Sequence, residues 1–141
     1  MYAFEYFAPK NLQEATKAFN SFNDSKWLAG GMTLIPSMKL RMNAPSALID
    51  LSSIEQLKGI SIKNNILSIG AMTIHADVAN SLDVINTLPA LASLASGIGD
   101  PQVRNRGTIG GSIANNDPAA DYPSAILGLK SKIITSKKEI D

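Results

Sequence analysis

The chain reads Leu28-Ala29-Gly30-Gly31-Met32-Thr33-Leu34-Ile35-Pro36 at one point and Gly107-Thr108-Ile109-Gly110-Gly111-Ser112-Ile113-Ala114-Asn115-Asn116-Asp117-Pro118 at another. We call these stretches the first glycine segment (28–36) and the second glycine segment (107–118). Because glycine lacks a Cβ, the main chain there can adopt positive φ and bring its N–H groups close to a ligand. Free N–H groups, especially at a helix start, attract phosphate. Two such segments can hold one elongated phosphate-containing ligand from two sides.

Each segment taken alone also fits a purely structural role. A strand–helix turn can need Gly30 and Gly31 for its geometry, and a tight turn or bulge can need Gly110 and Gly111. The hydroxyl of Thr108 can donate to a phosphate oxygen. Isolated glycine pairs are weak signals, so the residues leave both interpretations open.

Composition indicates one ordinary globular domain and argues against a nucleic-acid partner. The chain has 141 residues, of which 45% are hydrophobic and 18% charged. Its net charge of +1 gives no electrostatic attraction to nucleic acid, and 6% aromatic residues provide little surface for stacking bases.

The absence of cysteine restricts the chemistry and agrees with a reducing compartment. Without cysteine the chain cannot ligate an iron–sulfur cluster through thiolates, form a disulfide or use a thiol nucleophile. The N-terminus lacks the features of a signal peptide, and no apolar run is long enough to span a bilayer. We therefore expect a cytoplasmic protein without a membrane span.

The sequence around the first glycine segment predicts a small α/β unit. Asn11 has the character of a helix N-cap, with Glu14 as its capping-box partner, and Thr33 is the expected cap of the next helix. The predicted elements are a strand at 4–7, a helix from 12 to about 22, a strand at 26–29, a helix from 34 to about 42 and a strand at 47–51.

The remaining sequence predicts a hairpin followed mainly by helices. Apolar residues alternate on either side of Asn64-Asn65, which is typical of a hairpin. Further elements are expected as a helix after Thr73 to residue 80, a turn or short helix at 83–87, a helix at 89–96, a polar loop at 97–107, a helix at 121–129 and a strand at 132–135. No partner strand is evident for the last one. A boundary near residues 52–53 divides the chain into subdomains of about 1–52 and about 53–141.

Few side chains suggest chemistry of their own. Asp121 can accept hydrogen bonds from a ribose, or can simply stabilise a helix start through the dipole. His75 is the only histidine, and its position predicts a solvated or capping role. Asp117 and Asp121 have no histidine or third carboxylate nearby in sequence, so we predict no catalytic residue and no metal site.

The order of motifs resembles the FAD-binding medium subunit of the molybdenum hydroxylases, the group that includes carbon monoxide dehydrogenase and xanthine dehydrogenase. The likeness covers nearly the whole chain and corresponds to the N-terminal part of such a subunit. It is carried by both glycine segments in order, joined by Gln102-Val103-Arg104-Asn105, and by Phe4-Glu5-Tyr6, Leu48-Ile49-Asp50-Leu51, Ile69-Gly70-Ala71, Asp117-Pro118 and Asp121.

This resemblance implies an α+β fold: the two-subdomain FAD-binding fold of the vanillyl-alcohol oxidase (PCMH-type) group, here incomplete at the C-terminus and without the usual C-terminal domain. It implies that the diphosphate and nearby parts of FAD contact both glycine segments, that an apolar residue lies toward the adenine, and that an acidic residue touches the cofactor. The implied cofactor-binding residues are Leu28, Ala29, Gly30, Gly31, Met32, Thr33, Leu34, Ile98, Thr108, Ile109, Gly110, Gly111, Ser112 and Asp121.

The chain also departs from the family pattern. Met32-Thr33 stands where Thr-Asp or His-Ser is frequent, and Ser112 stands where Asn or Asp is frequent. These differences affect side-chain contacts, although backbone contacts need not change. The family's medium subunit is considerably longer, so we expect either a fragment or a split gene whose other chain completes it.

The function implied by resemblance is electron transfer through FAD in an oxidoreductase complex. Molybdopterin would lie on a large partner subunit and 2Fe–2S clusters on a small one, and a separate C-terminal half of the medium subunit is a further expected partner. A non-catalytic nucleotide-binding or assembly module is the alternative. A stand-alone flavin reductase is a third hypothesis, for which no nicotinamide-cofactor motif is present.

Overall fold

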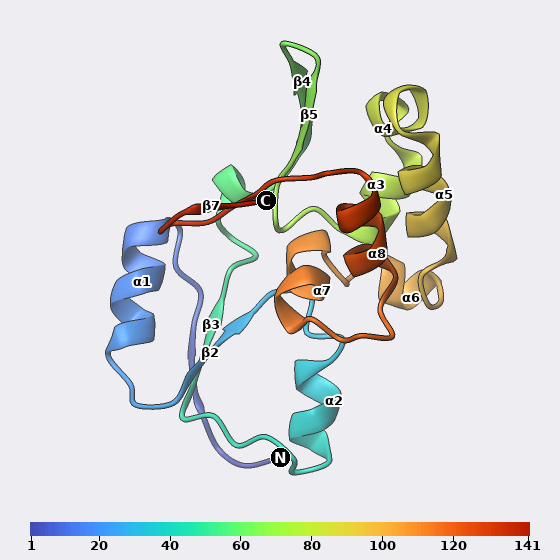
Figure 1. Ribbon diagram of the computed structural model, residues 1–141. Helices are drawn as coiled ribbons and strands as arrows, with labels where there is room; N and C mark the ends of the chain where they lie inside the picture. Colours follow the sequence, from blue (N-terminus) through green and yellow to red (C-terminus); the bar gives the residue numbers. More distant parts are fainter.

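A parallel three-stranded sheet carries the first glycine segment in the computed structural model, which describes residues 1–141. Its strands are β1 (Glu5–Phe7), β2 (Ser25–Leu28) and β3 (Ala47–Asp50), in the order β1-β3-β2. Alternate residues of β3 face opposite sides. Ala47 and Ile49 pack with α1 (Leu12–Asn20), whereas Leu48 packs with α2 (Leu34–Lys39), so one helix covers each face (Figure 1).

Local signals place the start of α1 as the sequence predicts. The Asn11 side chain accepts a hydrogen bond from the Glu14 N–H at 2.8 Å, while the Glu14 carboxylate accepts from the Lys10 N–H at 3.1 Å. The bond from the Lys10 N–H contributes most to lowering the pKa of the Glu14 carboxyl, and a bond from the Asn11 side-chain amide adds to it. The first helical turn is thereby closed by side chains.

The predicted cap of α2 is wrong in its detail. The helix begins at Leu34, directly after Thr33, but the Thr33 side chain makes no capping hydrogen bond. The helix also ends at Lys39 rather than near residue 42, because Arg41 takes a left-handed conformation with φ of 61°.

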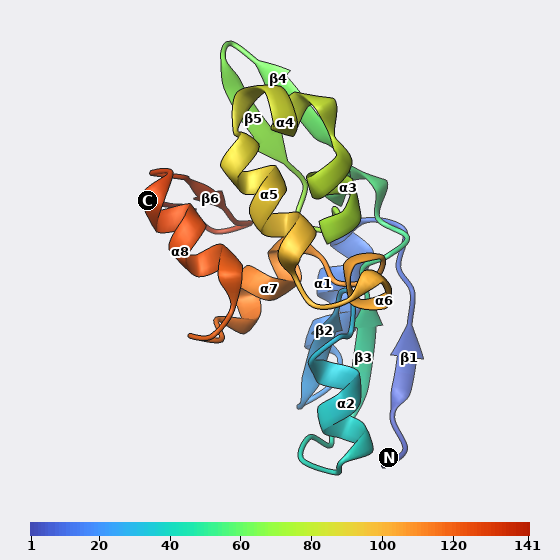
Figure 2. The ribbon, with the colours of Figure 1, turned by 90° about the vertical axis from the view of Figure 1, so that its right-hand side faces the viewer.

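The predicted hairpin is confirmed, and it extends at one end of the molecule beside α4 (Leu82–Thr87) (Figures 1 and 2). Strands β4 (Ile60–Lys63) and β5 (Ile66–Ile69) pair antiparallel, with Asn64 and Asn65 between them at φ of 51° and 62°. Positive φ at both central residues is the geometry that two-residue hairpin loops require, and asparagine tolerates it. A one-turn 3₁₀ helix, η1 (Glu55–Leu57), precedes the hairpin.

Helices dominate the rest of the chain and surround the largest apolar core. They are α3 (His75–Asn80), α4 (Leu82–Thr87), α5 (Pro89–Gly97), α6 (Pro101–Arg104), α7 (Ile109–Asn115) and α8 (Asp121–Gly128). None of these or the preceding helices has the length and hydrophobicity that crossing a membrane demands. The core contains Val78, Val84, Leu91, Ala92, Ala95, Ile109 and Tyr122.

Three sequence-based predictions for residues 53–141 are wrong. The polar loop expected at 97–107 contains α6, which Asp100 caps by accepting from the Val103 N–H at 2.8 Å. Thr73 does not cap α3, because its hydroxyl is occupied by the Gly59 main chain. The last predicted strand has a partner: β6 (Ile133–Ile134) pairs with β7 (Glu139–Ile140).

Candidate phosphate-binding site

The two glycine segments lie against each other, although about 80 positions separate them in sequence. A Cβ built on Gly30 would lie 2.2 Å from the carbonyl oxygen of Arg106 and 2.7 Å from the Cα of Gly107. A Cβ on Gly111 would lie 3.3 Å from that of Ala29. The turn after β2 and the start of α7 therefore meet backbone to backbone, near the centre of the molecule in Figure 1.

The first glycine segment presents a continuous run of unused donors. The backbone N–H groups of residues 29–34 have no acceptor within the chain, and Ile35 is the next to donate, to the Gly31 carbonyl at 3.0 Å. Gly31 has φ of 75°, a conformation that favours glycine. Because each backbone donor needs an acceptor, these groups must meet solvent or a ligand. Consecutive unpaired N–H groups at the carboxyl end of a parallel strand favour an anion.

In the second glycine segment, four successive N–H groups are already bonded to acceptors within the chain. The N–H of Ile109 donates to Thr73 at 3.0 Å and that of Gly110 to Ala71 at 2.9 Å. The N–H groups of Gly111 and Ser112 bond Thr108, through its hydroxyl and its carbonyl respectively. These four groups are therefore not the free donors that the sequence suggested, because α7 begins here and its first turn is already capped. Ligand contacts from this segment stay a prediction.

The strip Ala71–His75 supports the second glycine segment, and sequence reasoning missed it. Its carbonyls accept the two hydrogen bonds from Ile109 and Gly110, and the backbone N–H of His75 donates to the Gly107 carbonyl at 3.0 Å. Ile74 also forms an isolated bridge with Thr108. A Cβ on Gly110 would lie 2.5 Å from that of Ala71, so the approach requires glycine. An isolated bridge between distant positions leaves no periodic signal in the sequence.

Asp121 and Ile98, the other two predicted contacts, lie in different surroundings. Asp121 is exposed at the first position of α8. Ile98 is half-buried at the end of α5, packs against the main core, and its carbonyl accepts a hydrogen bond from the Arg104 guanidinium at 3.0 Å. The contact of either side chain with a cofactor stays a prediction.

His75 is buried, with 4% of its surface exposed, and its side chain caps no helix, so the solvated or capping role expected from sequence is wrong. It faces the core, with its ring centroid 5.4 Å from that of Tyr122. Burial lowers the pKa of His75, and the negative charge of Asp121 partly opposes this. Burial likewise raises the pKa of Tyr122, and there Asp121 adds to the effect.

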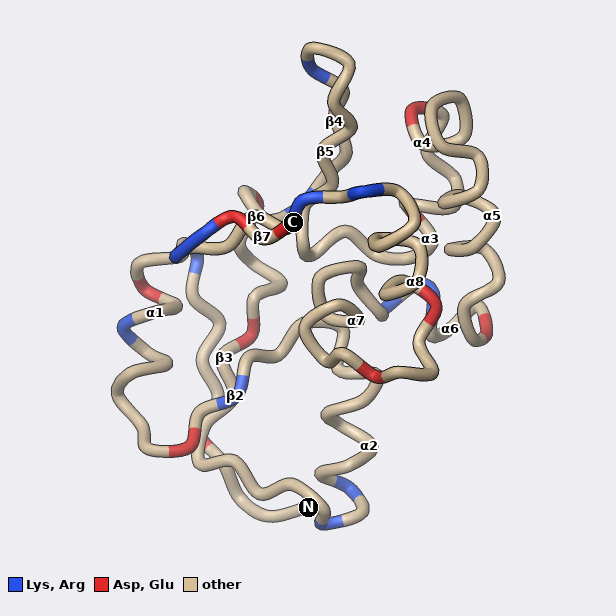
Figure 3. Tube along the Cα trace, in the orientation of Figure 1, with Lys and Arg blue, Asp and Glu red and all other residues tan.

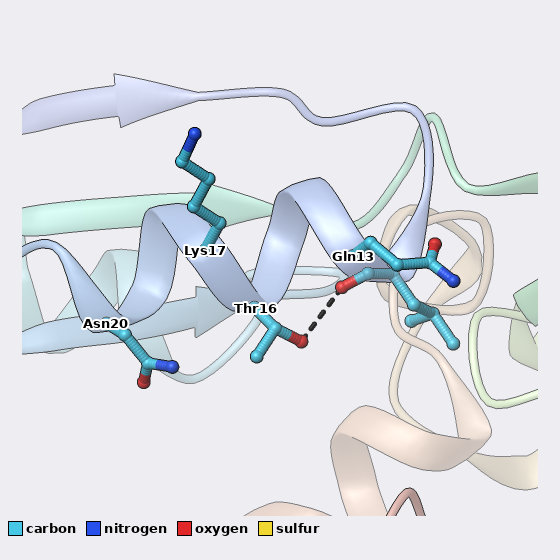
Figure 4. Close-up of a pocket in the computed structure, with 5 residues that line it drawn as sticks. Gln13, Thr16, Lys17 and Asn20 are labelled. Atoms are coloured by element: carbon cyan, nitrogen blue, oxygen red, sulfur yellow. Dashed lines mark hydrogen bonds between the residues drawn. The ribbon is translucent and has the colours of Figure 1, made fainter.

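Two surface hollows lie elsewhere. Figure 4 shows one on the outer side of α1, where the Thr16 hydroxyl donates to the Leu12 carbonyl at 2.8 Å. It is lined by Leu12, Gln13, Thr16, Lys17 and Asn20. A second, mainly apolar hollow lies between α5 and α8. Neither is lined by a residue of either glycine segment, so the candidate site is defined by its main-chain donors.

A parallel sheet whose second strand leads into a donor-rich turn, close to a distant glycine segment, defines an α+β protein with a candidate anion-binding site. Comparison with known proteins specifies this class. The model of the FAD binding domain in molybdopterin dehydrogenase matches residues 2–140. The chain belongs to that family, as the motif order predicts.

Curated relatives agree with this assignment. The chain is 45% identical over 132 residues to the carbon monoxide dehydrogenase medium chain of Hydrogenophaga pseudoflava, covering 93% of this chain and 46% of the relative. It is 39% identical to the glyceraldehyde dehydrogenase medium chain of Sulfolobus acidocaldarius, covering 94% and 47%. The chain thus spans about half the length of the curated relatives it matches.

Solved structures confirm the predicted fold class. A chain of carbon monoxide dehydrogenase from Hydrogenophaga pseudoflava superimposes with a TM-score of 0.84 at 49% identity, covering 86% of this chain and 43% of that one. A chain of the Cu,Mo-CO dehydrogenase crystal structure has a TM-score of 0.90 at 34% identity, covering 99% and 50%.

Proposed function

We propose that this chain binds FAD as part of the electron-transfer subunit of a multi-subunit molybdenum hydroxylase. The observation that carries the proposal is the run of unpaired N–H groups at residues 29–34, beside the second glycine segment. Family membership supplies the identity of the anion: the diphosphate of FAD. When bound, FAD supplies the redox chemistry, and the protein provides position and electrostatics.

The residues present fit such a group. A hydrogen bond to a charged oxygen contributes about 1.5–3 kcal/mol, so a few of these N–H groups suffice to hold a diphosphate. No carboxylate lies within residues 28–36, where it would repel the ligand. Asp121, exposed at the start of α8, is the proposed acceptor for hydroxyl or N–H groups of the cofactor.

The proposed partners are a large subunit that carries molybdopterin and a small subunit that carries iron–sulfur clusters. These 141 residues contain no cysteine with which to ligate a cluster, which fits clusters held outside this chain. Relatives carry the names medium chain and medium subunit, which fits a role within an assembly. We propose that FAD passes these electrons to a final acceptor and that the chain alone is inactive as a dehydrogenase.

The test is a fluorescence titration of the purified chain with FAD, compared with two variants. Gly30→Ala places a methyl group against the Arg106 carbonyl, whereas Gly128→Ala meets nothing within 4 Å. We expect one FAD per chain for the wild type and for Gly128→Ala, and at least tenfold weaker binding for Gly30→Ala, since about 1.4 kcal/mol of distortion suffices for that factor.

Circular dichroism and analytical ultracentrifugation would accompany the titration. A folded wild-type chain that binds no FAD would contradict the proposal, as would a folded Gly30→Ala variant with unchanged affinity.

A second candidate function is a non-catalytic nucleotide-binding or assembly module. It is favoured by one observation, that the chain spans about half of its relatives, whose remaining length can contribute cofactor contacts. Under this alternative the chain purifies as a colourless protein, and the same titration with ADP shows binding that FAD does not improve.

A further inference from the structure

Two buried polar groups lie behind the second glycine segment without a hydrogen-bond partner. They are Nδ1 of His75 and the hydroxyl of Tyr122, in side chains that are 4% and 0% exposed. Their rings are neighbours, with centroids 5.4 Å apart and planes inclined by 43°. A buried polar atom without a partner destabilises the folded state. A core selected for stability alone would place apolar side chains here, so this pair points to another role.

His75 touches the second glycine segment directly. Its backbone N–H donates to the Gly107 carbonyl at 3.0 Å. Its imidazole lies so close to Gly107 that a Cβ there would be 2.5 Å from Nε2. The imidazole also neighbours the ring of Tyr122, the residue that follows Asp121 at the start of α8. The imidazole is therefore packed between the second glycine segment and the helix that presents the predicted acidic contact.

The charged surroundings of the imidazole are sparse. Helix α5, its main neighbour, has no ionisable residue. The guanidinium of Arg104 on α6 is occupied by carbonyls of the preceding turn. The other ionisable groups on the elements around it are Asp77 on α3, Asp83 on α4, and Asp121 and Tyr122 on α8. Asp121 is the one whose charge acts on His75.

We propose that His75 is a positioning residue of the flavin site: its neutral imidazole holds the second glycine segment and the start of α8 in register, and protonation of the ring releases them. The proton comes from solvent. The resulting imidazolium has no acceptor at Nδ1 and is drawn toward the Asp121 carboxylate, which moves the ring from its seat against Gly107. The consequence for FAD rests on the proposed function, whereas the coupling within the chain does not.

The coupling is tested without any ligand. Because His75 is the only histidine, a proton NMR titration of its ring between pH 8 and 5 reports this one group. We expect the amide signals of residues 107–111 and of Tyr122 to shift with the same midpoint. In His75→Gln these shifts are absent. In Tyr122→Phe, which keeps the ring, the midpoint moves because a polar hydroxyl is removed from the ring that neighbours the imidazole.

The proposal would be overturned if the His75 ring titrates while the amide chemical shifts of residues 107–111 do not change. So would a folded wild-type chain in which His75 does not titrate above pH 5. A variant that keeps the native amide spectrum at pH 8 is folded. If His75→Gln does not fold, the shift of the titration midpoint in Tyr122→Phe tests the proposal by itself.

FAD binding provides the second readout. For the wild type, the dissociation constant rises as pH falls through the His75 titration, approaching about tenfold per pH unit, because the bound form requires the neutral ring. For His75→Gln it stays level over the same range. Equal pH profiles for the two proteins would contradict the proposal. If the wild type binds no FAD at any pH, the proposed function fails, while the amide titration still decides whether His75 is coupled to the second glycine segment.

Discussion

Individual glycines in this chain serve different physical requirements. Gly30 is needed because the Arg106 carbonyl and the Gly107 Cα occupy the space of a side chain, whereas Gly31 is needed for its φ of 75°. Gly97 and Gly128 lie in helices with nothing within 4 Å of a built Cβ. The sequence alone does not distinguish the roles of these glycines. Only the contacts separate those that bring the two segments together from those that alanine can replace.

Tyr122→Phe is expected to stabilise the folded chain by about 1–2 kcal/mol, because it removes a buried hydroxyl without a partner and keeps the ring. Tyr6→Phe is the matched control, since that exposed hydroxyl donates to Asp50 and its loss gives little or slightly negative change. Urea unfolding of the three proteins at pH 7.5 measures both effects. A loss of stability in Tyr122→Phe would show that its hydroxyl has a partner in solution.

Stability should fall on mild acidification because of His75. Burial lowers the pKa of His75 in the folded chain, so the unfolded chain binds the proton more readily. The contribution is complete above the unfolded value, about 6.5, and is lost as pH falls below it toward the lower folded pKa. Urea midpoints at pH 7.5 and 5.5 measure this loss, which His75→Gln should lack. Equal losses in both proteins would assign the effect to carboxylates.

At the scale of elements, local chemistry was predictable and pairing between distant strands was not. The Asn11 cap and the Asn64-Asn65 hairpin follow from neighbouring residues, and the structure confirms both. The bridge between Ile74 and Thr108 depends on a contact between distant positions that no local pattern reveals. Thr73 illustrates the limit: a good helix cap by type is recruited by the distant Gly59 main chain.

Asn11→Ala should cost about 1 kcal/mol of stability, because it leaves an N–H of the first turn of α1 without its acceptor and also releases Glu14. Asn20→Ala, at the other end of the same helix, is exposed and should change stability by less than about 0.5 kcal/mol. Thermal unfolding by circular dichroism compares them. Equal effects of the two substitutions would mean that the cap contributes nothing.

For the whole molecule, the close approach of the two glycine segments joins the parallel sheet to the helical part of the chain. The motifs predicted that these segments converge, and the contact of Gly30 with Arg106 and Gly107 bears this out. The sequence did not predict which of the two segments leaves its N–H donors free. The N–H groups of residues 29–34 are free, whereas those of Ile109 and Gly110 bond Thr73 and Ala71, positions that carried no signal of this role. The free donors are consequently the part of the molecule that a diphosphate should change most.

This asymmetry predicts the pattern of hydrogen exchange on adding FAD. Amides of residues 29–34 lack acceptors and should gain strong protection, whereas those of residues 109–112 are already bonded and should change little. FAD at about 100 times its dissociation constant should also stabilise the chain by about 2.7 kcal/mol. ADP, which has the diphosphate, should protect residues 29–34 as well, and riboflavin, which lacks it, should not. Equal protection by riboflavin would contradict this prediction, because it would mean that the free donors hold the ring system or its ribityl chain instead of the diphosphate.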